Sequence, residues 1–283
     1  MKSLTDTYTL SNGVKIPCVG FGTWQAENGE QAVNSVKAAL KVGYRHIDTA
    51  MIYENEQSIG QAIRESGVPR GEIFVTTKLW NADQGYETTL KAFDASMKRL
   101  GLDVLDLYLI HWPMTKGRAD QWPELNRETW RAMESLYKDG RIRAIGVSNF
   151  LVKFLEPLLQ SAEIAPMVNQ IELHPGFLQK DTVQLCKQRG ILVESWAPLS
   201  RGKLLQGDTL SPLTQKHNKT PAQIILRWHL QHGLLPLPKS VTPSRIEQNT
   251  KIFDFELSTD EMAFMDNLKD VQWSNLDPLT AAF

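Results

Sequence analysis

The chain has 283 residues, 42% of them hydrophobic and 22% charged, and its formal net charge at pH 7 is −1. This is the composition of a globular protein with a large core, and the balanced charge gives no electrostatic attraction to nucleic acid or to an anionic membrane. The two cysteines, Cys18 and Cys186, lack metal-ligand or redox spacing, which is typical of a reducing compartment. Residues 1–10 contain no apolar signal core, and no stretch approaches the roughly 18 apolar residues of a membrane span. We therefore expect a cytoplasmic protein without nucleic-acid or membrane partners.

The chain begins with a predicted β-hairpin over residues 8–17. Asn12 and Gly13 stand at its centre, and both tolerate the positive φ angles that a tight hairpin turn requires. The hairpin precedes a long region in which short and long patterned segments alternate.

Eight short apolar runs alternate with amphipathic segments in that region. The predicted strands are residues 19–22, 45–48, 73–78, 104–111, 144–148, 167–172, 192–196 and 234–238. The predicted helices include residues 31–41, 87–100, 129–138, 181–189 and 221–232. Glycines stand at the exits of many predicted helices: Gly43, Gly101, Gly140, Gly190 and Gly233. This alternation predicts parallel strands joined by right-handed crossovers.

Polar residues at the strand ends favour a closed barrel over a doubly wound sheet. Functional groups of a barrel gather where its strands end, and here the predicted strands end in Asp48, Lys78, His111, Ser148, Asn149, Gln170, Trp196 and Lys239. A doubly wound nucleotide-binding fold has a glycine-rich turn after its first strand, but residues 20–25 lack the third glycine. We therefore predict a (β/α)8 TIM barrel with an N-terminal β-hairpin, as a single domain over residues 1–283.

Four residues after neighbouring predicted strands form a candidate catalytic group: Asp48, Tyr53, Lys78 and His111. Each alone is more often a solvated or packing residue, but together they meet at one mouth of the barrel. A tyrosine hydroxyl titrates at about pH 10, so it holds a proton at neutral pH and can donate it to a carbonyl that accepts a hydride. A neighbouring Lys78 ammonium lowers the pKa of Tyr53, and Asp48 keeps that lysine charged. His111 can donate a hydrogen bond to the carbonyl oxygen.

Several segments carry a family resemblance. They are Lys78 and residues 46–53, 109–113, 146–150, 169–175 and 238–241. On these segments the chain resembles the aldo-keto reductase superfamily, over nearly its whole length from the hairpin to about Leu257. It is similar to short-loop microbial and protozoan members, including 2,5-diketogluconate reductases and prostaglandin F synthases. The resemblance implies a monomer that reduces aldehydes and ketones, with Tyr53 as general acid, Lys78 and Asp48 as the pair that tunes its pKa, and His111 as substrate orienter.

The resemblance also implies an extended NADPH/NADP+ groove at the same mouth. It assigns Ser148, Asn149 and Gln170 to the nicotinamide carboxamide and stacks the ring on Trp196. The pyrophosphate is assigned to Ala197, Pro198, Leu199, Ser200, Arg201 and Gly202. The remaining cofactor residues are Gly22, Thr23, Lys239, Ser240, Val241, Arg245, Gln248 and Asn249, with the 2′-phosphate at Lys239, Ser240 and Arg245. The residues themselves agree with that phosphate position, since residues 243–245 open a helix with free N–H groups, but taken alone they fit a solvated basic turn equally well.

Aromatic residues at the mouth predict an apolar substrate pocket. Trp24, Trp80 and Trp112 would line it together with His111.

Met51 and Glu54 depart from the residues common in the family and put the substrate range in doubt. Trp122 and Trp273 fall in loops that the pattern does not place, His229 and His232 are interpreted as structural, and no metal site is indicated.

Two other functions compete with that of a reductase. A metal-free aldolase would use Lys78 as a Schiff base, which requires a neutral lysine and is opposed by the adjacent Asp48. A cofactor-binding regulatory barrel without activity is the second, and the complete set of Asp48, Tyr53, Lys78 and His111 favours an enzyme over it. The partner is then a small carbonyl substrate, whose identity the sequence leaves open.

Overall fold

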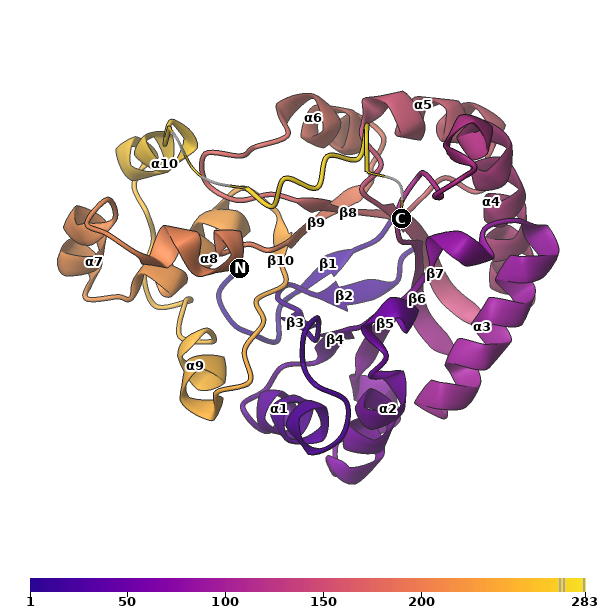
Figure 1. The fold of residues 1–283 in the computed structure, drawn as a ribbon. Helices are drawn as coiled ribbons and strands as arrows, with labels where there is room; N and C mark the ends of the chain where they lie inside the picture. The colour runs from indigo at the N-terminus through magenta and orange to yellow at the C-terminus, as the bar shows by residue number, and fades with distance from the viewer. Residues whose placement is uncertain (270, 272, 282) are drawn as a thin grey trace.

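The computed structural model describes residues 1–269, 271, 273–281 and 283. Eight parallel strands follow one another in chain order around the molecule (Figure 1). They are β3 Phe21–Gly22, β4 His46–Asp48, β5 Phe74–Leu79, β6 Leu105–Ile110, β7 Ile142–Ser148, β8 Val168–Glu172, β9 Leu192–Trp196 and β10 Leu235–Pro236. Backbone hydrogen bonds from Gly20 N to Pro236 O (3.1 Å) and from Gly22 N to Pro238 O (3.0 Å) join the first strand to the last. The predicted (β/α)8 barrel is confirmed.

The predicted hairpin is present as β1 Thr7–Thr9 and β2 Lys15–Pro17, paired antiparallel. Its turn differs from the prediction, because Gly13 has a φ of +86° while Asn12 keeps a negative φ. The turn closes through Gly13 N donating to Leu10 O and Leu10 N donating to Val14 O, so the glycine alone takes the left-handed position. The hairpin lies across the N-terminal ends of the barrel strands (Figure 1), where the Tyr8 hydroxyl donates to Leu234 O.

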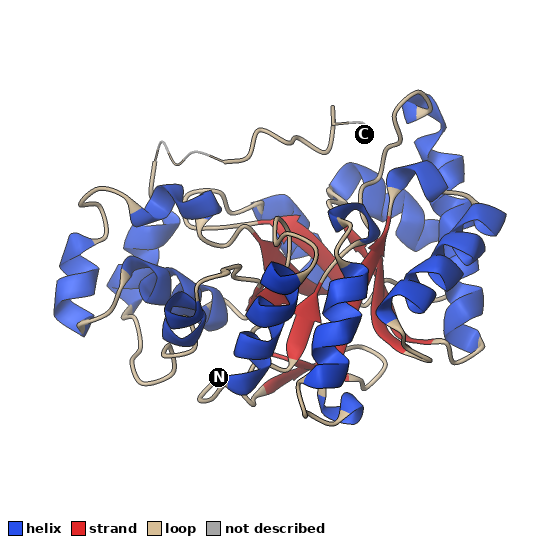
Figure 2. Cartoon of the chain, turned by 60° about the horizontal axis from the view of Figure 1, so that its bottom comes forward, coloured by secondary structure: helices blue, strands red, loops and turns tan. Residues whose placement is uncertain are grey.

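Helices pack around the outside of the strands (Figure 2). They are α1 Glu30–Lys41, α2 Glu56–Glu65, α3 Tyr86–Leu100, α4 Trp122–Lys138, α5 Val152–Ser161, α6 Lys180–Gln188, α7 Ser211–His217, α8 Pro221–Gln231, α9 Pro243–Gln248 and α10 Thr259–Asp266. The five glycines predicted at helix exits all have positive φ. Helix α4 begins at Trp122 rather than at residue 129, and Trp122 packs edge-on against Phe154 of α5 at 4.9 Å between ring centroids. Among the described residues, no helix is long and apolar enough to cross a membrane.

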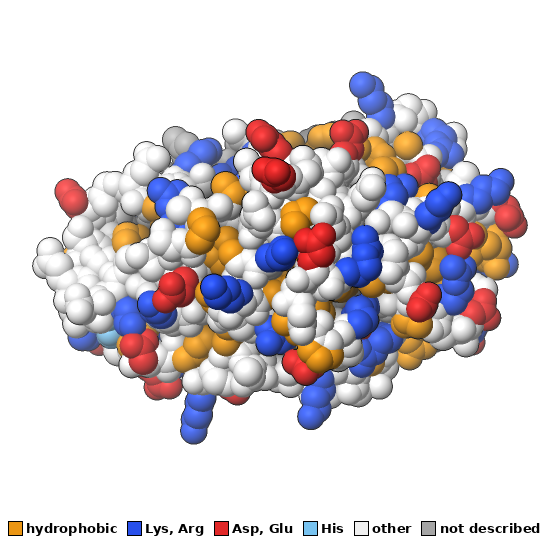
Figure 3. Space-filling view, turned by 90° about the horizontal axis from the view of Figure 1, so that it is seen from below, with side chains coloured by type: hydrophobic (Ala, Val, Ile, Leu, Met, Phe, Trp, Pro, Cys, Tyr) orange, Lys and Arg blue, Asp and Glu red, His pale blue; other side chains and the backbone are white. Residues whose placement is uncertain are grey.

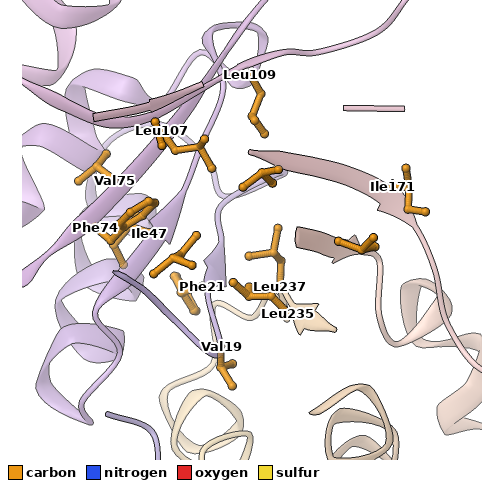
Figure 4. Packing of buried hydrophobic residues seen from close by; sticks show 14 of the residues in the cluster. Val19, Phe21, Ile47, Phe74, Val75, Leu107, Leu109, Ile171, Leu235 and Leu237 are labelled. Carbon is orange, nitrogen blue, oxygen red and sulfur yellow. The ribbon is translucent and has the colours of Figure 1, made fainter. Parts of the chain in front are cut away.

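The strands are buried on both faces, because one face meets the helices and the other meets the barrel interior. Every residue of β5 and of β6 is buried. Apolar residues from several strands pack together in Figure 4, among them Ile47, Val75, Leu107 and Leu235. A polar side chain on the inner face therefore lies in a largely dry environment, where its hydrogen bonds and charge partners decide its ionisation.

The surface carries charges of both signs. On the face shown in Figure 3, basic and acidic side chains are interspersed and separated by uncharged residues. This distribution agrees with the net charge of −1.

Candidate active site

Lys78 lies at the centre of a buried polar cluster at the C-terminal ends of β4 and β5. Its Nζ donates to Asp48 Oδ1 at 2.7 Å, to Thr49 O at 2.9 Å and to the Tyr53 hydroxyl at 3.4 Å. The side chain of Lys78 is fully buried, so these three oxygens take the place of water around its ammonium. Tyr53 is brought above the lysine by the short 3-10 turn Met51–Tyr53, which directly follows β4.

Burial and the neighbouring charges shift the pKa values of Tyr53 and Lys78 in opposite directions. Burial raises the pKa of Tyr53 above its ordinary value, while the Lys78 ammonium lowers it and offsets part of the rise. Burial lowers the pKa of Lys78, but Asp48 and Tyr53 together more than compensate, through their charges and hydrogen bonds, and leave it raised. At neutral pH the cluster therefore holds a charged lysine beneath a protonated tyrosine. The influence of Lys78 on Tyr53 has the predicted direction, but in the free protein burial outweighs it.

His111 follows β6 and faces Tyr53 across the mouth. Its ring centroid lies 5.7 Å from that of Tyr53 and 5.4 Å from that of Trp80, both edge-on. Burial, assisted by the charge of Lys78, holds the pKa of His111 well below its usual range, so its imidazole is neutral. Its Nδ1 has no hydrogen-bond partner among the described residues. A neutral imidazole carries one N–H and can donate it to a substrate oxygen.

The residues predicted for the carboxamide lie together on β7 and β8. Ser148 Oγ donates to Gln170 O at 2.8 Å, and Asn149 Nδ2 donates to His111 O at 2.9 Å. Trp196 Nε1 donates to Asn149 Oδ1 at 2.8 Å, which fixes the indole beside them. Asn149 has a φ of +64°, a conformation that asparagine tolerates better than most residues. Hydrogen bonds thus hold this part of the mouth in place without a ligand.

A cavity of about 860 Å³ occupies the mouth, within the range of about 300–1,000 Å³ typical of ligand sites. Asp48, Tyr53 and His111 line it, while Lys78 lies buried behind them. The predicted substrate residues Trp24, Trp80 and Trp112 also line it. So do the predicted cofactor residues Gly22, Ser148, Asn149, Gln170, Trp196, Ala197, Pro198, Leu199, Arg201, Gly202, Lys239, Ser240, Arg245, Gln248 and Asn249.

Three predicted cofactor residues do not line this cavity. Thr23 is buried and its hydroxyl donates to Asp48 O at 2.9 Å, so it supports the strand end instead. Ser200 is buried, with only 2% of its surface exposed, and Val241 is exposed. All three lie next in sequence to residues that line the cavity, and their assignment to the cofactor stays a prediction.

The segment after β9 is held in an irregular conformation. Ala197, Ser200, Arg201 and Gly202 all have positive φ angles, between +48° and +87°. The Arg201 guanidinium lies over the Trp24 ring at 4.7 Å from its centroid, so this loop meets the loop after β3. Lys239 Nζ reaches the same loop and donates to Gln25 O at 3.1 Å. Basic side chains from the segments after β9 and β10 therefore meet at the loop after β3, beside the cavity, where they can bind the phosphates of a dinucleotide.

The C-terminal segment covers part of the mouth, which the sequence did not predict. Trp273 stacks on Phe177 at 5.0 Å, and Ser274 N donates to Glu172 Oε1 at 2.8 Å. Farther along, the Phe283 ring lies 5.0 Å from that of Trp112 and lines the cavity. Figure 1 shows this segment crossing the barrel. It has no regular hydrophobic period, so no pattern in the sequence indicated where it lies.

Comparison with known proteins agrees with this geometry. Residues 18–270 match the model of the Aldo/keto reductase family. The chain is 56% identical over 266 residues to the glyoxal reductase of Bacillus subtilis (strain 168), covering 94% of each chain. It is 48% identical over 273 residues to the 9,11-endoperoxide prostaglandin H2 reductase of Trypanosoma cruzi (strain CL Brener), covering 95% of this chain and 94% of that one. The crystal structure of a Gox0644 mutant in complex with NADPH superimposes with a TM-score of 0.90 at 40% identity and covers 99% of both chains.

Proposed function

The chain belongs to the aldo/keto reductase family, and from that premise we propose that it reduces small aldehydes and ketones with Tyr53 as the proton donor. As a member of this family it is an NADP-dependent oxidoreductase that acts on carbonyl groups. The observation that carries the assignment of Tyr53 is its hydroxyl, which lies 3.4 Å from the buried Lys78 ammonium and lines the cavity.

The residues along the groove fit NADPH. Ser148, Asn149 and Gln170 offer amide and hydroxyl groups to a carboxamide, and Trp196 offers an aromatic face to the nicotinamide ring. Lys239 and Arg245 offer positive charge to the 2′-phosphate. When bound there, NADPH supplies the hydride that the carbonyl carbon accepts.

This chain's own residues then handle the oxygen and its proton. The N–H of neutral His111 donates to the substrate carbonyl oxygen and orients it toward Tyr53. As the carbon gains the hydride, the Tyr53 O–H bond breaks and its proton passes to the forming alkoxide, which gives the alcohol. The tyrosinate left behind is stabilised by the Lys78 ammonium until it recovers a proton from solvent. Asp48 keeps Lys78 charged throughout.

The test is Tyr53→Phe, assayed by NADPH oxidation with glyoxal. General acid catalysis contributes about 10²–10⁴-fold, so turnover should fall by at least about 10²-fold. Fluorescence titration should show NADPH affinity nearly unchanged, because the hydroxyl is assigned to the carbonyl and not to the cofactor. Tyr86→Phe, on α3 beneath Arg131, is the matched control and should behave as wild type. A Tyr53→Phe enzyme that keeps more than a tenth of wild-type turnover would rule out Tyr53 as the donor. A wild-type protein that binds NADPH but reduces no aldehyde would favour the regulatory barrel.

A further inference from the structure

A second buried carboxyl lies beneath the catalytic cluster. Glu194 stands on β9, two residues before Trp196, and its side chain is fully buried in the barrel interior. Gln170 Nε2 donates to Glu194 Oε2 at 2.8 Å and to Asp48 Oδ2 at 2.9 Å. Both N–H groups of the Gln170 amide are thereby engaged by carboxyl groups. Its Oε1 is the amide atom left for a ligand in the cavity, which Gln170 lines.

We propose that Glu194 is a positioning residue of this active site: it fixes the Gln170 amide, and through that amide it orients Asp48 and presents the Gln170 carbonyl oxygen to the cofactor groove. The inference rests on the proposed function. Without Glu194, one N–H of Gln170 loses its acceptor in a dry interior, and the bond to Asp48 alone no longer fixes the orientation of the amide. A change in that orientation would weaken the hydrogen bond to Asp48 and move Oε1 away from the groove.

The titratable groups that face Glu194 come from two strands, β4 and β5. His46 Nε2 of β4 lies 4.0 Å from Glu194 Oε1, and Asp48 of β4 and Lys78 of β5 act on it through their charges. On the other side β10 pairs with Glu194 through Leu235, and both of its residues are apolar. Burial lowers the pKa of His46 to about 3, so His46 is neutral and offers no counter-charge.

Glu194 itself is protonated at neutral pH. Burial, and then the negative charge of Asp48, raise its pKa to about 8. Its Oε1 has no hydrogen-bond partner among the described residues, so nothing there stabilises the ionised form. Once it ionises, Glu194 adds a second negative charge next to Asp48. That charge disfavours the tyrosinate form of Tyr53 and moves the pKa of Tyr53 upward.

Two substitutions separate the two parts of the proposal. Glu194→Gln keeps a carbonyl oxygen for the Gln170 amide but cannot ionise, whereas Glu194→Leu removes both. We expect Glu194→Leu to weaken NADPH binding about tenfold or more by fluorescence titration, the loss of one hydrogen bond of about 1.4 kcal/mol. Glu194→Gln should bind NADPH within about threefold of wild type.

The effect of the Glu194 charge on Tyr53 is tested by the pH profile of NADP+-dependent alcohol oxidation, because this reaction requires deprotonated Tyr53. In Glu194→Gln the rise of rate with pH should occur at a pH lower by about half a unit or more, because no second negative charge develops. A purely structural loss would lower the rate at every pH without moving the profile.

Thermal melting without cofactor tests the ionisation of Glu194 independently. The unfolded Glu194 carboxyl titrates at about 4.3 and the folded one at about 8, so the unfolded state binds fewer protons between these values. Wild-type stability should therefore fall from pH 5 to pH 8 relative to Glu194→Gln, and the difference in Tm should widen steadily.

Glu56→Gln is the matched control, since Glu56 is equally buried but binds Arg99 and Thr77 away from the cavity. Its oxidation profile should superimpose on that of wild type. The proposal is overturned if the wild type reduces glyoxal while Glu194→Leu binds NADPH normally and the Glu194→Gln profile is unmoved. A wild type that reduces no carbonyl would instead contradict the proposed function. If Glu194→Leu does not fold, the oxidation profile and the melting series of Glu194→Gln still decide.

Discussion

Single residues decide the chemistry of this site because the barrel interior removes water from them. Lys78 shows this most clearly: its ammonium has three protein oxygens around it and no exposed surface. In such a place a charge persists only with partners, and removing one partner leaves the other uncompensated. The proposed catalytic role of Lys78 and its structural role therefore cannot be separated by a single rate measurement.

Lys78→Met should lose both roles. The buried Asp48 carboxylate loses its counter-ion, and breaking a buried pair in this way costs about 3–5 kcal/mol, to be measured by chemical denaturation. In whatever folded enzyme remains, the rise of the alcohol-oxidation profile should move to higher pH, since no ammonium stabilises the tyrosinate. Lys37→Met is the control, because the Lys37–Glu65 pair is exposed and such pairs contribute little to stability. An unmoved profile would show that Lys78 is not coupled to Tyr53.

The sequence was informative about residues at strand ends and much less so about residues inside the barrel. Asp48, Lys78 and His111 end apolar runs, where a polar residue is conspicuous. Glu194 was missed because it lies within a predicted strand, although its even spacing from Trp196 places it on the same face. Thr23 and Ser200 were assigned to the cofactor site together with their neighbours in sequence, and they are not among the residues that line the cavity.

At the scale of elements, helices with polar buried faces escaped prediction. Helix α2 buries Glu56 and Ser58 along with Ile59, so its apolar pattern is interrupted. The Glu56 carboxylate accepts from Arg99 at 2.6 Å, an ion pair that only the folded chain assembles. Helix α5 contains Pro157, which argues against a helix in any single-sequence analysis. The barrel strands were easier to predict from the sequence, because burial on both faces makes them continuous apolar runs.

The contact between α2 and α3 depends on Gly60. A Cβ atom at this position would lie 2.0 Å from the carbonyl oxygen of Leu100, a backbone atom that cannot move freely. Gly60→Ala should therefore destabilise the protein by about 1–3 kcal/mol or more. Gly71→Ala is the matched control, because nothing lies within 4 Å of its Cβ position. Equal urea midpoints for the two variants would show that α2 can shift without cost.

The segment from β10 to α9 should set the preference for NADPH over NADH. The two cofactors differ by one 2′-phosphate, and Lys239 and Arg245 stand at the cavity with exposed side chains. Two charge-assisted hydrogen bonds of about 1.5 kcal/mol each, the low end because of exposure, correspond to about 10²-fold. Lys239→Ala combined with Arg245→Ala should weaken NADPH binding by that factor and leave NADH binding almost unchanged.

Fluorescence titration with both cofactors measures this preference. Lys251→Ala, a nearby exposed lysine paired with Glu247, is the control and should change neither affinity. Equal losses for NADPH and NADH would mean that Lys239 and Arg245 hold the part of the dinucleotide that the two cofactors share.

At the scale of the whole molecule, the alternation of strands and helices was enough to predict the barrel. The position of the C-terminal segment over the barrel mouth was not predictable. The C-terminal segment reaches the mouth through a few particular contacts, such as Trp273 on Phe177 and Ser274 on Glu172. Contacts of this kind leave no periodic trace in the sequence. The parts of the site built on strands were therefore anticipated, and the parts built on the C-terminal segment were found only in the structure.

The join between β3 and β10 has a consequence for how the molecule assembles and comes apart. These strands come from opposite ends of the chain, so a nascent polypeptide holds two unpaired sheet edges until its last strand has been synthesised. Gly22 and Lys239 stand on the two sides of that join, and both line the groove. A dinucleotide bound across them, as proposed, would bind only the closed barrel. At a hundred times its Kd such a ligand would add about 2.7 kcal/mol to the free energy of unfolding, so the cofactor would also hold the first and last strands together.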